Sequence, residues 1–190
     1  SISSYSELIK QVKYGHNKDH ERLPQINLAM VFGEKSGLPV YYRMLPGNIS
    51  DVSTMENMIA DAAFLEFAKV KLVWDMGFFS AKNVNALYHA HYKFLGGLRP
   101  DTTLARSSVE AARDKLVHYA NYLEDDDVYC ISTMINWDYA WSMRNGEEER
   151  GKRRLYVHVY YNEQRAAAER SQFNHDLKEL KTAEQNGKAT

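Results

Sequence analysis

The feature that most limits the possible folds is an alternation of short apolar runs with helix-spaced segments. The run KLVWD (71–75) is apolar with polar residues on both sides, which predicts a buried central strand. KFLGGLRP (93–100) predicts the next strand, which its proline ends. Between them, AKNVNALYHAHY (81–92) has helical spacing and Ser80 as a candidate N-cap. This order of strand, helix and strand predicts parallel pairing and therefore an α/β fold.

An antiparallel hairpin is expected before this region. QINLAMVFG (25–33) and LPVYYRML (38–45) have the composition of two strands, joined by a four-residue turn that ends in Gly37. A helix should begin at Ser50 or Asp51. Its apolar residues recur every three or four positions and predict one buried face, made of Val52, Met55, Ile59, Ala62 and Ala63. The hairpin and the parallel strands together predict a mixed sheet with flanking helices.

The character of the chain changes after residue 100. Residues 104–123 are amphipathic and charged, and an acidic turn, EDDD, follows at 124–127. Two or three strands with a turn at Asn145-Gly146 come next, and then a helix from about residue 163 to 183. We therefore expect two domains, residues 1–100 and a β-rich inserted region with the start of a following helix over 101–190.

Charge and cysteine content exclude several classes of protein. The formal net charge is −1, so no strong overall field draws the chain to nucleic acid or to an anionic membrane, although a local basic groove is compatible with this total. The single cysteine, Cys130, excludes a disulfide framework and favours a reducing, cytoplasmic setting. No apolar run approaches the roughly 20 residues that a membrane span needs, so we expect no membrane partner.

Asp75 is the residue whose position raises a functional question. It follows an apolar strand, and the carboxyl ends of strands in open α/β sheets are where sites gather. Gly77 lets the backbone turn away and leave the carboxylate at the rim of the sheet. Position alone leaves two interpretations open: Asp75 caps the helix that follows, or it belongs to a metal or catalytic site.

Three stretches in order support the second interpretation. They are YGHNKDH (14–20), which precedes the hairpin, PGNISD (46–51), which ends it, and DMGFFS (75–80), which follows the apolar strand. HYKFLGGLRP comes next. Together they resemble the catalytic core of bacterial insertion-sequence transposases of the DDE type. The resemblance is strong over residues 1 to 100 and loose beyond them.

The resemblance implies a ribonuclease H-like fold, with a β-rich inserted region after the fifth core strand. It implies that two Asp and one Glu hold two divalent ions, Mg²⁺ or Mn²⁺, for in-line phosphoryl transfer at DNA ends. Asp75 would be the second Asp, both a metal ligand and a catalytic residue. Double-stranded DNA, as element ends and as target, would be the partner. The protein would act as a homodimer on that DNA, in the bacterial cytoplasm at the nucleoid.

Two of the three acids have no clear counterpart in this chain. The first Asp would fall just upstream of Ser1, because the serine-rich segment that follows it in the family corresponds to SISSYS. The third, a Glu on a late helix, is imitated by Tyr161, Arg165 and Glu169, but their spacing differs from that of the family. We therefore expect the parent protein to be the enzyme and this chain alone to be inactive. A non-catalytic DNA-binding or assembly module from a decayed element, or a metal-dependent nuclease on the same fold, are the alternatives.

Basic residues suggest where DNA would lie. Lys18 and Arg22, in a polar loop beside the site, could contact phosphates. Arg153 and Arg154 belong to a basic turn, 150–154, beside an aromatic strand. That turn is either a contact to the DNA backbone or a charged sheet edge that opposes aggregation.

Overall fold

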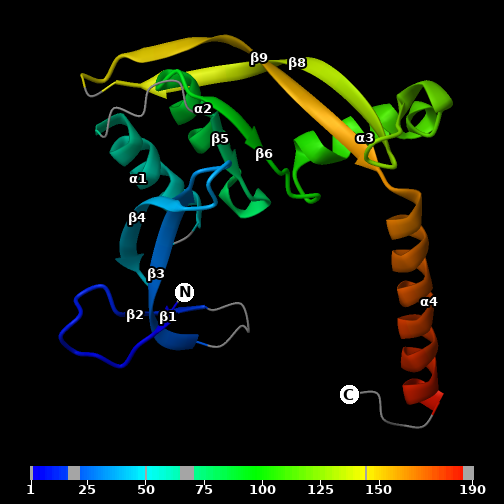
Figure 1. Ribbon diagram of the computed structural model, residues 1–190, viewed down its shortest axis with the longest axis horizontal. Helices are drawn as coiled ribbons and strands as arrows, with labels where there is room; N and C mark the ends of the chain where they lie inside the picture. Colours follow the sequence, from blue (N-terminus) through cyan, green and yellow to red (C-terminus); the bar gives the residue numbers. More distant parts are fainter. Residues whose placement is uncertain (1, 17–21, 50, 65–70, 144, 186–190) are drawn as a thin grey trace. The chain divides into compact units, whose positions relative to one another are not determined.

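The chain is seen here as a computed structural model (Figure 1), and the description covers residues 2–16, 22–49, 51–64, 71–143 and 145–185. It divides into two compact units. The first unit comprises residues 1–99 with 138–151, and the second comprises 100–137 with 152–190. Strands and helices occur in both, so the predicted mixed α/β class is confirmed. No helix among the described residues is long and apolar enough to cross a membrane.

The first unit contains an antiparallel sheet built on the long strand β3 (Arg22–Phe32). Strand β4 (Pro39–Pro46) returns along β3, and the turn between them includes Gly37 at a φ of 63°. The predicted hairpin is therefore confirmed. Strands β1 (Ile2–Ser3) and β2 (Lys13–His16) also pair with β3, on its opposite edges.

The polar segment YGHNKDHERLP (14–24), which contains Lys18 and Arg22, is predicted to be a loop, and this prediction is wrong at both ends of the segment. Tyr14 pairs with Pro24, and His16 pairs with Arg22. Strand β2 passes close to the backbone of Gly47. Only glycine fits at position 15, because a Cβ atom there would lie 2.0 Å from the carbonyl oxygen of Gly47. A polar sequence is compatible with a strand whose side chains face solvent, so polarity alone did not identify a loop.

The PGN element (46–48), at the end of β4, is held against β3 by two side-chain amides, one buried and one half-buried. Gln25 Nε2 donates to the Gly47 carbonyl at 3.1 Å, and Asn27 Nδ2 donates to the Ile49 carbonyl at 3.0 Å. A Cβ at Gly47 would lie 2.1 Å from the Gln25 carbonyl oxygen, so only glycine fits this approach of two backbones. The element is therefore a packed corner of the sheet.

The second sheet of this unit pairs β5 (Lys71–Trp74) with β6 (Lys93–Gly96) in parallel, as the sequence predicts. Helix α1 (Asp51–Phe64) precedes β5, and helix α2 (Ala81–His89) connects β5 to β6. Ser80 caps α2 by accepting a hydrogen bond from the Asn83 amide at 3.0 Å, which confirms the predicted N-cap.

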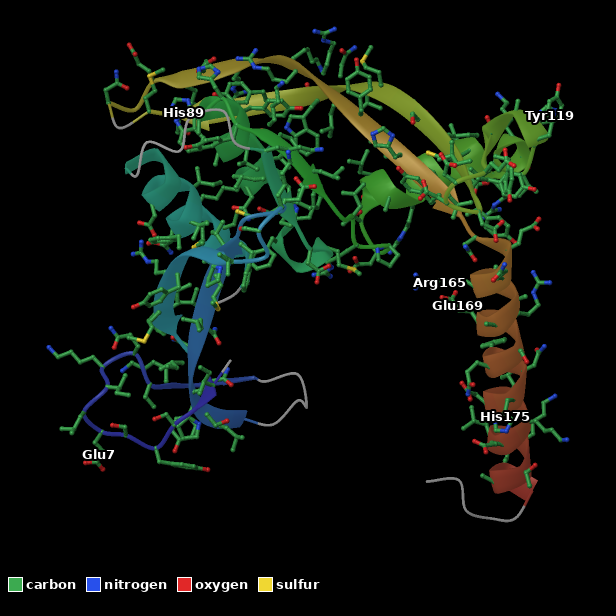
Figure 2. All side chains as sticks on the ribbon, in the orientation of Figure 1. Glu7, His89, Tyr119, Arg165, Glu169 and His175 are labelled. Carbon is green, nitrogen blue, oxygen red and sulfur yellow. The ribbon has the colours of Figure 1, made fainter. Side chains whose placement is uncertain are left out.

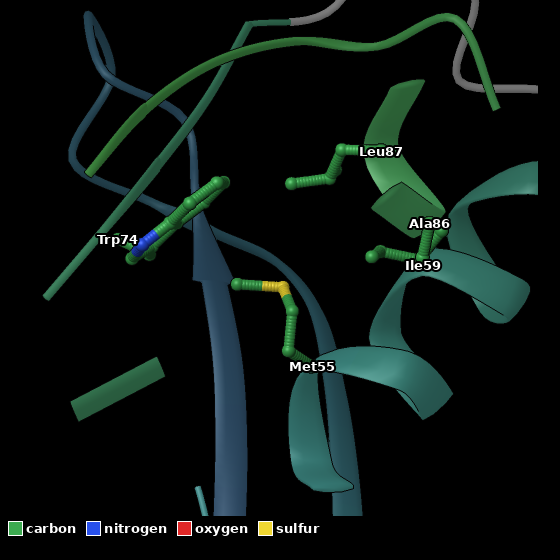
Figure 3. Close-up of a cluster of buried hydrophobic side chains, with 5 residues drawn as sticks. All are labelled: Met55, Ile59, Trp74, Ala86 and Leu87. Carbon is green, nitrogen blue, oxygen red and sulfur yellow. The ribbon is translucent and has the colours of Figure 1, made fainter. Parts of the chain in front are cut away.

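One hydrophobic cluster joins these elements (Figure 3). Its buried members come from α1, β5 and α2, and they are Met55, Ile59, Trp74, Ala86 and Leu87. Met55 and Ile59 thus confirm the predicted face of α1, while the side chains of Val52, Ala62 and Ala63 lie outside the described residues.

The prediction that β5 is a buried central strand is correct for one of its faces and wrong for the other. Trp74 is buried, but Val73, on the opposite face of the strand, is 65% exposed. Neighbouring residues of a strand face opposite sides, and the cluster covers only one of them. Among the described strands, β5 also has a neighbour on one edge only.

The second unit begins with helix α3 (Thr103–Leu116), and its small sheet has the order β7-β8-β9. The strands are β7 (Tyr122–Leu123), β8 (Val128–Ser142) and β9 (Glu148–Tyr161). The turn between β8 and β9 contains Gly146 at a φ of 87°, as its sequence predicts. Helix α4 (Glu163–Gln185) follows. The predicted division into residues 1–100 and 101–190 remains a prediction.

The ends of β8 and β9 nearest their turn, residues 138–151, belong to the first unit. There the ring of Trp141 stacks on His89 at the end of α2, with ring centroids 4.5 Å apart. Tyr139 is 2% exposed, and its hydroxyl lies 3.3 Å from His89 Nδ1 and donates to Glu149 at 3.2 Å. The two contacts with His89 attach the turn end of the hairpin to α2.

Candidate active site

Asp75 directly follows β5 and faces solvent. Its Oδ1 accepts a hydrogen bond from the Met76 amide at 2.6 Å, and it caps the 3₁₀ turn η1 (Met76–Phe78). The capping interpretation of this residue is therefore correct for η1. It does not exclude a second role, because a carboxylate has two oxygens and this contact uses one lone pair of one of them.

The DMGFFS stretch holds the backbone of Asp75 through a chain of short contacts. The Phe78 amide donates to the Asp75 carbonyl at 3.1 Å. Asn83, which is 0% exposed, donates from Nδ2 to the Phe78 carbonyl at 2.8 Å, and Ser80 caps the same first turn of α2. The carboxylate is consequently presented by a strand end, a 3₁₀ turn and a helix N-terminus that are bonded to one another.

Glycines keep the neighbouring strand end close to Asp75. A Cβ at Gly96 would lie 2.1 Å from Trp74 Nε1, and one at Gly97 would lie 3.2 Å from the Met76 amide nitrogen. The glycine pair in KFLGGLRP therefore lets β6 end directly beside β5. Because the strands are parallel, their carboxyl ends meet at one edge, where an acid can face a substrate.

The donor set around Asp75 is suited to a divalent ion only in part. An exposed carboxylate at a rigid strand end can supply one oxygen ligand of the kind that Mg²⁺ prefers. In the part of the chain that the structure describes, one group of three His, Cys, Asp or Glu side chains has ligand atoms within 4.8 Å of one another, and Asp75 is not in it. The described residues thus offer one candidate ligand for the implied site and do not complete it.

That group of three lies on α4, in the second unit, and comprises His175, Asp176 and Glu179 (Figure 2 labels the first). All three are exposed, and His175 Nδ1 lies 3.9 Å from Glu179 Oε1. On the same helix Arg165 Nε donates to Glu169 at 2.8 Å. The loose imitation of the third acid is therefore one half of an exposed i, i+4 ion pair.

Two of the four predicted DNA contacts, Arg153 and Arg154, have side chains that the structure describes. Lys18 and the side chain of Arg22 lie outside the described residues, although the backbone of Arg22 begins β3. The prediction of a basic turn over 150–154 is wrong, because these residues lie within β9. As consecutive residues of a strand, Arg153 and Arg154 face opposite sides; Arg153 is half-buried and Arg154 is exposed.

The family model described as "Transposase DDE domain" matches residues 3–175. The chain belongs to this family. The predicted membership in the DDE transposases is therefore confirmed, and with it the expectation that the protein is of a class that acts on DNA. No curated protein and no solved structure matches the chain significantly.

The sequence did not identify the polar side chains that form hydrogen bonds to the backbone of the transposase motifs. Gln25 and Asn27 hold the PGN corner, and Asn83 holds η1. Gln25 and Asn27 are polar residues within an otherwise apolar strand, and Asn83 lies beside the buried residue Val84 in α2. That exception to the pattern is the signal that could have identified them.

Proposed function

We propose that this chain is the part of a DDE transposase catalytic domain that presents Asp75 as a metal ligand. The complete protein would cleave DNA at the element ends to give a 3′-OH and then join that end to target DNA. The observation that carries the proposal is the exposed carboxylate of Asp75, held at the carboxyl edge of a parallel strand pair in a chain of this family. Bound Mg²⁺ or Mn²⁺ would activate the attacking oxygen and stabilise the leaving one.

The open edges of the two sheets support a proposal for where the rest of the site would lie. Strand β1 pairs with Ile26 and Gln25 on one edge of β3, and beyond this point residues 27–32 have no partner on that edge among the described strands. One edge of β5 is likewise without a described partner. A strand that extends β1 upstream would lie along β3, and if it also paired with β5 it would join the two sheets.

This added strand would give the ribonuclease H-like arrangement implied by the resemblance. Its last residues would lie beside the end of β5, so an Asp there would be a neighbour of Asp75. We expect the Glu of the triad after the inserted region, outside the described residues. With one of three acids, the 190-residue chain should bind divalent ions weakly and show no cleavage.

Arg154 is the better supported of the two basic residues on β9, because it is exposed whereas Arg153 is half-buried. Lys18 and Arg22 remain candidates for phosphate contacts near the site. An assembly of two copies on DNA is part of the same proposal.

The test uses a longer chain that includes the flanking segments on both sides. With Mg²⁺ or Mn²⁺, this protein should cleave element-end DNA, and Asp75→Asn should reduce cleavage by at least a hundredfold while the fold is retained. Asp75→Cys should restore more activity with Mn²⁺ than with Mg²⁺, because a thiolate is a softer ligand. Cleavage that survives Asp75→Asn would refute the role of this residue.

Asp114→Asn is the matched control, since Asp114 is an exposed acid on α3. It should leave cleavage unchanged. A strand-transfer assay on the same samples separates a transposase, which joins the 3′-OH to a second DNA, from a nuclease that only cuts.

A further inference from the structure

Asn83 is a polar residue at a fully buried position of α2. It is 0% exposed, and its helix neighbours Val84 and Leu87 are 1% and 0% exposed. Burial of an amide costs free energy unless its hydrogen bonds are made inside the protein. Asparagine is also a weaker helix former than alanine or leucine. Neither burial nor helix formation therefore accounts for an asparagine at this position.

The start of α2 does not depend on the Asn83 side chain either. Ser80 is the N-cap, and its Oγ accepts a hydrogen bond from the backbone amide of Asn83 at 3.0 Å. The Asn83 side chain makes a different contact: Nδ2 donates to the carbonyl of Phe78, five residues earlier, at 2.8 Å. The side chain thus links α2 to the 3₁₀ turn η1 that precedes it.

Little apolar burial holds η1 in place. None of its three residues is buried, although Phe78 packs against the hydrophobic cluster. Within the turn, the Phe78 amide donates to the Asp75 carbonyl at 3.1 Å. The Phe79 amide donates to the Met76 carbonyl at 3.2 Å. A short turn of this kind is stabilised by its hydrogen bonds, so the bond from Asn83 should contribute a large share of its order.

The carboxylate of Asp75 takes its direction from the same turn. Its Oδ1 accepts a hydrogen bond at 2.6 Å from the amide of Met76, the first residue of η1. A displacement of η1 therefore moves this amide and the carboxylate together. Mg²⁺ demands near-ideal octahedral geometry from its oxygen ligands, so a small displacement is enough to weaken ion binding in a chain that remains folded.

We propose that Asn83 is a positioning residue for Asp75. Its side-chain amide fixes η1 against α2, and η1 in turn orients the Asp75 carboxylate toward a divalent ion. Asn83 contacts neither the ion nor DNA in this role. The inference rests on the proposed function for the role of Asp75, but the link between Asn83 and η1 can be tested without it.

The first measurement follows amide hydrogen exchange by NMR in the 190-residue chain without metal. The reporters are the amides of Phe78 and Phe79, which donate within η1. In Asn83→Ala they should exchange about threefold to tenfold faster than in the wild type, the factor that one hydrogen bond of ordinary strength contributes. The amide of Tyr92, which donates to the Leu87 carbonyl beyond the other end of α2, should change less.

The second measurement follows single-turnover cleavage of element-end DNA by the longer chain with Mg²⁺. Asn83→Ala should lower the maximal rate by about tenfold to a hundredfold and raise the Mg²⁺ concentration that gives half of it, as loss of a residue that orients a metal ligand does. The DNA concentration that gives half of the maximal rate should stay unchanged, because Asn83 does not contact DNA. A loss of folded protein alone would not produce this split.

Val84→Ala is the matched control, since Val84 is the next residue of α2 and is equally buried but apolar. It should lower the stability of the fold and leave both cleavage and the exchange at η1 as in the wild type. Asn83→Thr is a second variant, because threonine is close to asparagine in volume but too short to reach the Phe78 carbonyl. It should behave as Asn83→Ala does, and it takes the place of that variant if circular dichroism shows that the alanine variant has not folded.

Wild-type cleavage by a folded Asn83→Ala or Asn83→Thr variant would overturn the proposal, and so would unchanged exchange at Phe78 and Phe79. An equal loss of cleavage in Val84→Ala would also overturn it, since burial alone would then explain the effect. Asp75→Asn separates this inference from the proposed function. If Asp75→Asn retains cleavage, the proposed function fails. If Asp75→Asn loses cleavage and Asn83→Ala retains it, this inference alone fails.

Discussion

Helices α2 and α4 have similar sequence patterns and opposite surroundings. Both carry apolar residues at three- and four-residue spacing, which predicts one apolar face. In α2, Val84 and Leu87 are 1% and 0% exposed. In α4, Phe173 and Leu180 are 60% and 67% exposed. The pattern thus predicts which residues share a face, but it does not say what covers that face.

The difference follows from what adjoins each helix in the chain. Helix α2 connects two parallel strands, so the crossover brings its apolar face onto β5, β6 and α1. Helix α4 follows the last strand of the second unit, and within this unit no described residue buries its stripe of Phe173, Leu177 and Leu180. The apolar side chains of α2 should therefore contribute more to the free energy of unfolding than those of α4.

The largest expected effect on stability comes from emptying the covered face. Leu87→Ala should lower the free energy of unfolding by about 2–5 kcal/mol, because it removes a buried side chain and leaves a cavity in the cluster. Leu180→Ala should lower it by less than about 0.5 kcal/mol, since this side chain is exposed. Urea unfolding followed by circular dichroism measures both. Equal losses would show that the stripe on α4 is buried in solution.

Two glycines provide a second comparison, between a close approach and a turn. Gly47→Ala should destabilise the first unit by about 1–3 kcal/mol, because the new Cβ would overlap the carbonyl oxygens of Gln25 and Lys13, and backbone cannot move aside as a side chain can. Gly146→Ala places its Cβ in open space and should lose about 1 kcal/mol through its φ of 87° alone.

Thermal unfolding of both variants, with Gly33→Ala as a further member of the series, measures this difference. A Cβ at Gly33 would meet the hydroxyl of Ser36, at the tip of a side chain that can rotate away. If Gly47→Ala lowered the stability no more than Gly33→Ala does, the backbone at the PGN corner would have room for a Cβ atom.

Features that depend on residues close together in the chain could be predicted from the sequence. Features that depend on what packs against an element could not. Ser80 as a cap, the turn at Gly146 and the hairpin of β3 and β4 each depend on residues close together in the chain. The family assignment is similar: the order and spacing of three motifs predicted it, and the family model confirms it, whereas the role of Asp75 remains a prediction. The burial of β5 was overestimated because an apolar strand does not reveal whether one or both of its faces are covered.

The basic residues of β9 illustrate the same limit. Four cations within five residues resemble a turn by composition, yet the strand continues through them. The strand period then separates Arg153 from Arg154, which composition groups together. Among the described residues no second carboxylate forms a metal-binding group with Asp75, so the acids expected to complete the site remain a prediction.

The smallest expected effect on stability comes from ion pairs. An ion pair that joins two elements of the first unit should stabilise the fold more than one within α4. Asp61 of α1 accepts hydrogen bonds at 2.6 Å from the Tyr41 hydroxyl and from Arg43 Nη1, both on β4. Partial burial opposes the charge of Asp61, but the hydrogen bonds from Arg43 and Tyr41 outweigh it, so its pKa lies below the usual range. The pair Arg165–Glu169 joins two side chains on one exposed helix face.

Because the pKa of Asp61 is lower in the folded chain than in the unfolded one, ionised Asp61 stabilises the fold. This contribution is fully present above the unfolded pKa of about 3.9 and is lost as the pH falls through the folded value.

Asp61→Asn should therefore lower the free energy of unfolding by about 1 kcal/mol at pH 7, and the difference from wild type should shrink toward pH 3. Glu169→Gln should change it by less than about 0.5 kcal/mol. Urea unfolding at both pH values is the measurement, and a loss for Asp61→Asn that is the same at pH 3 would mean that the contact acts through shape and neutral hydrogen bonds. In that case the anchoring of α1 to the sheet would not depend on charge, and its contrast with α4 would be one of packing alone.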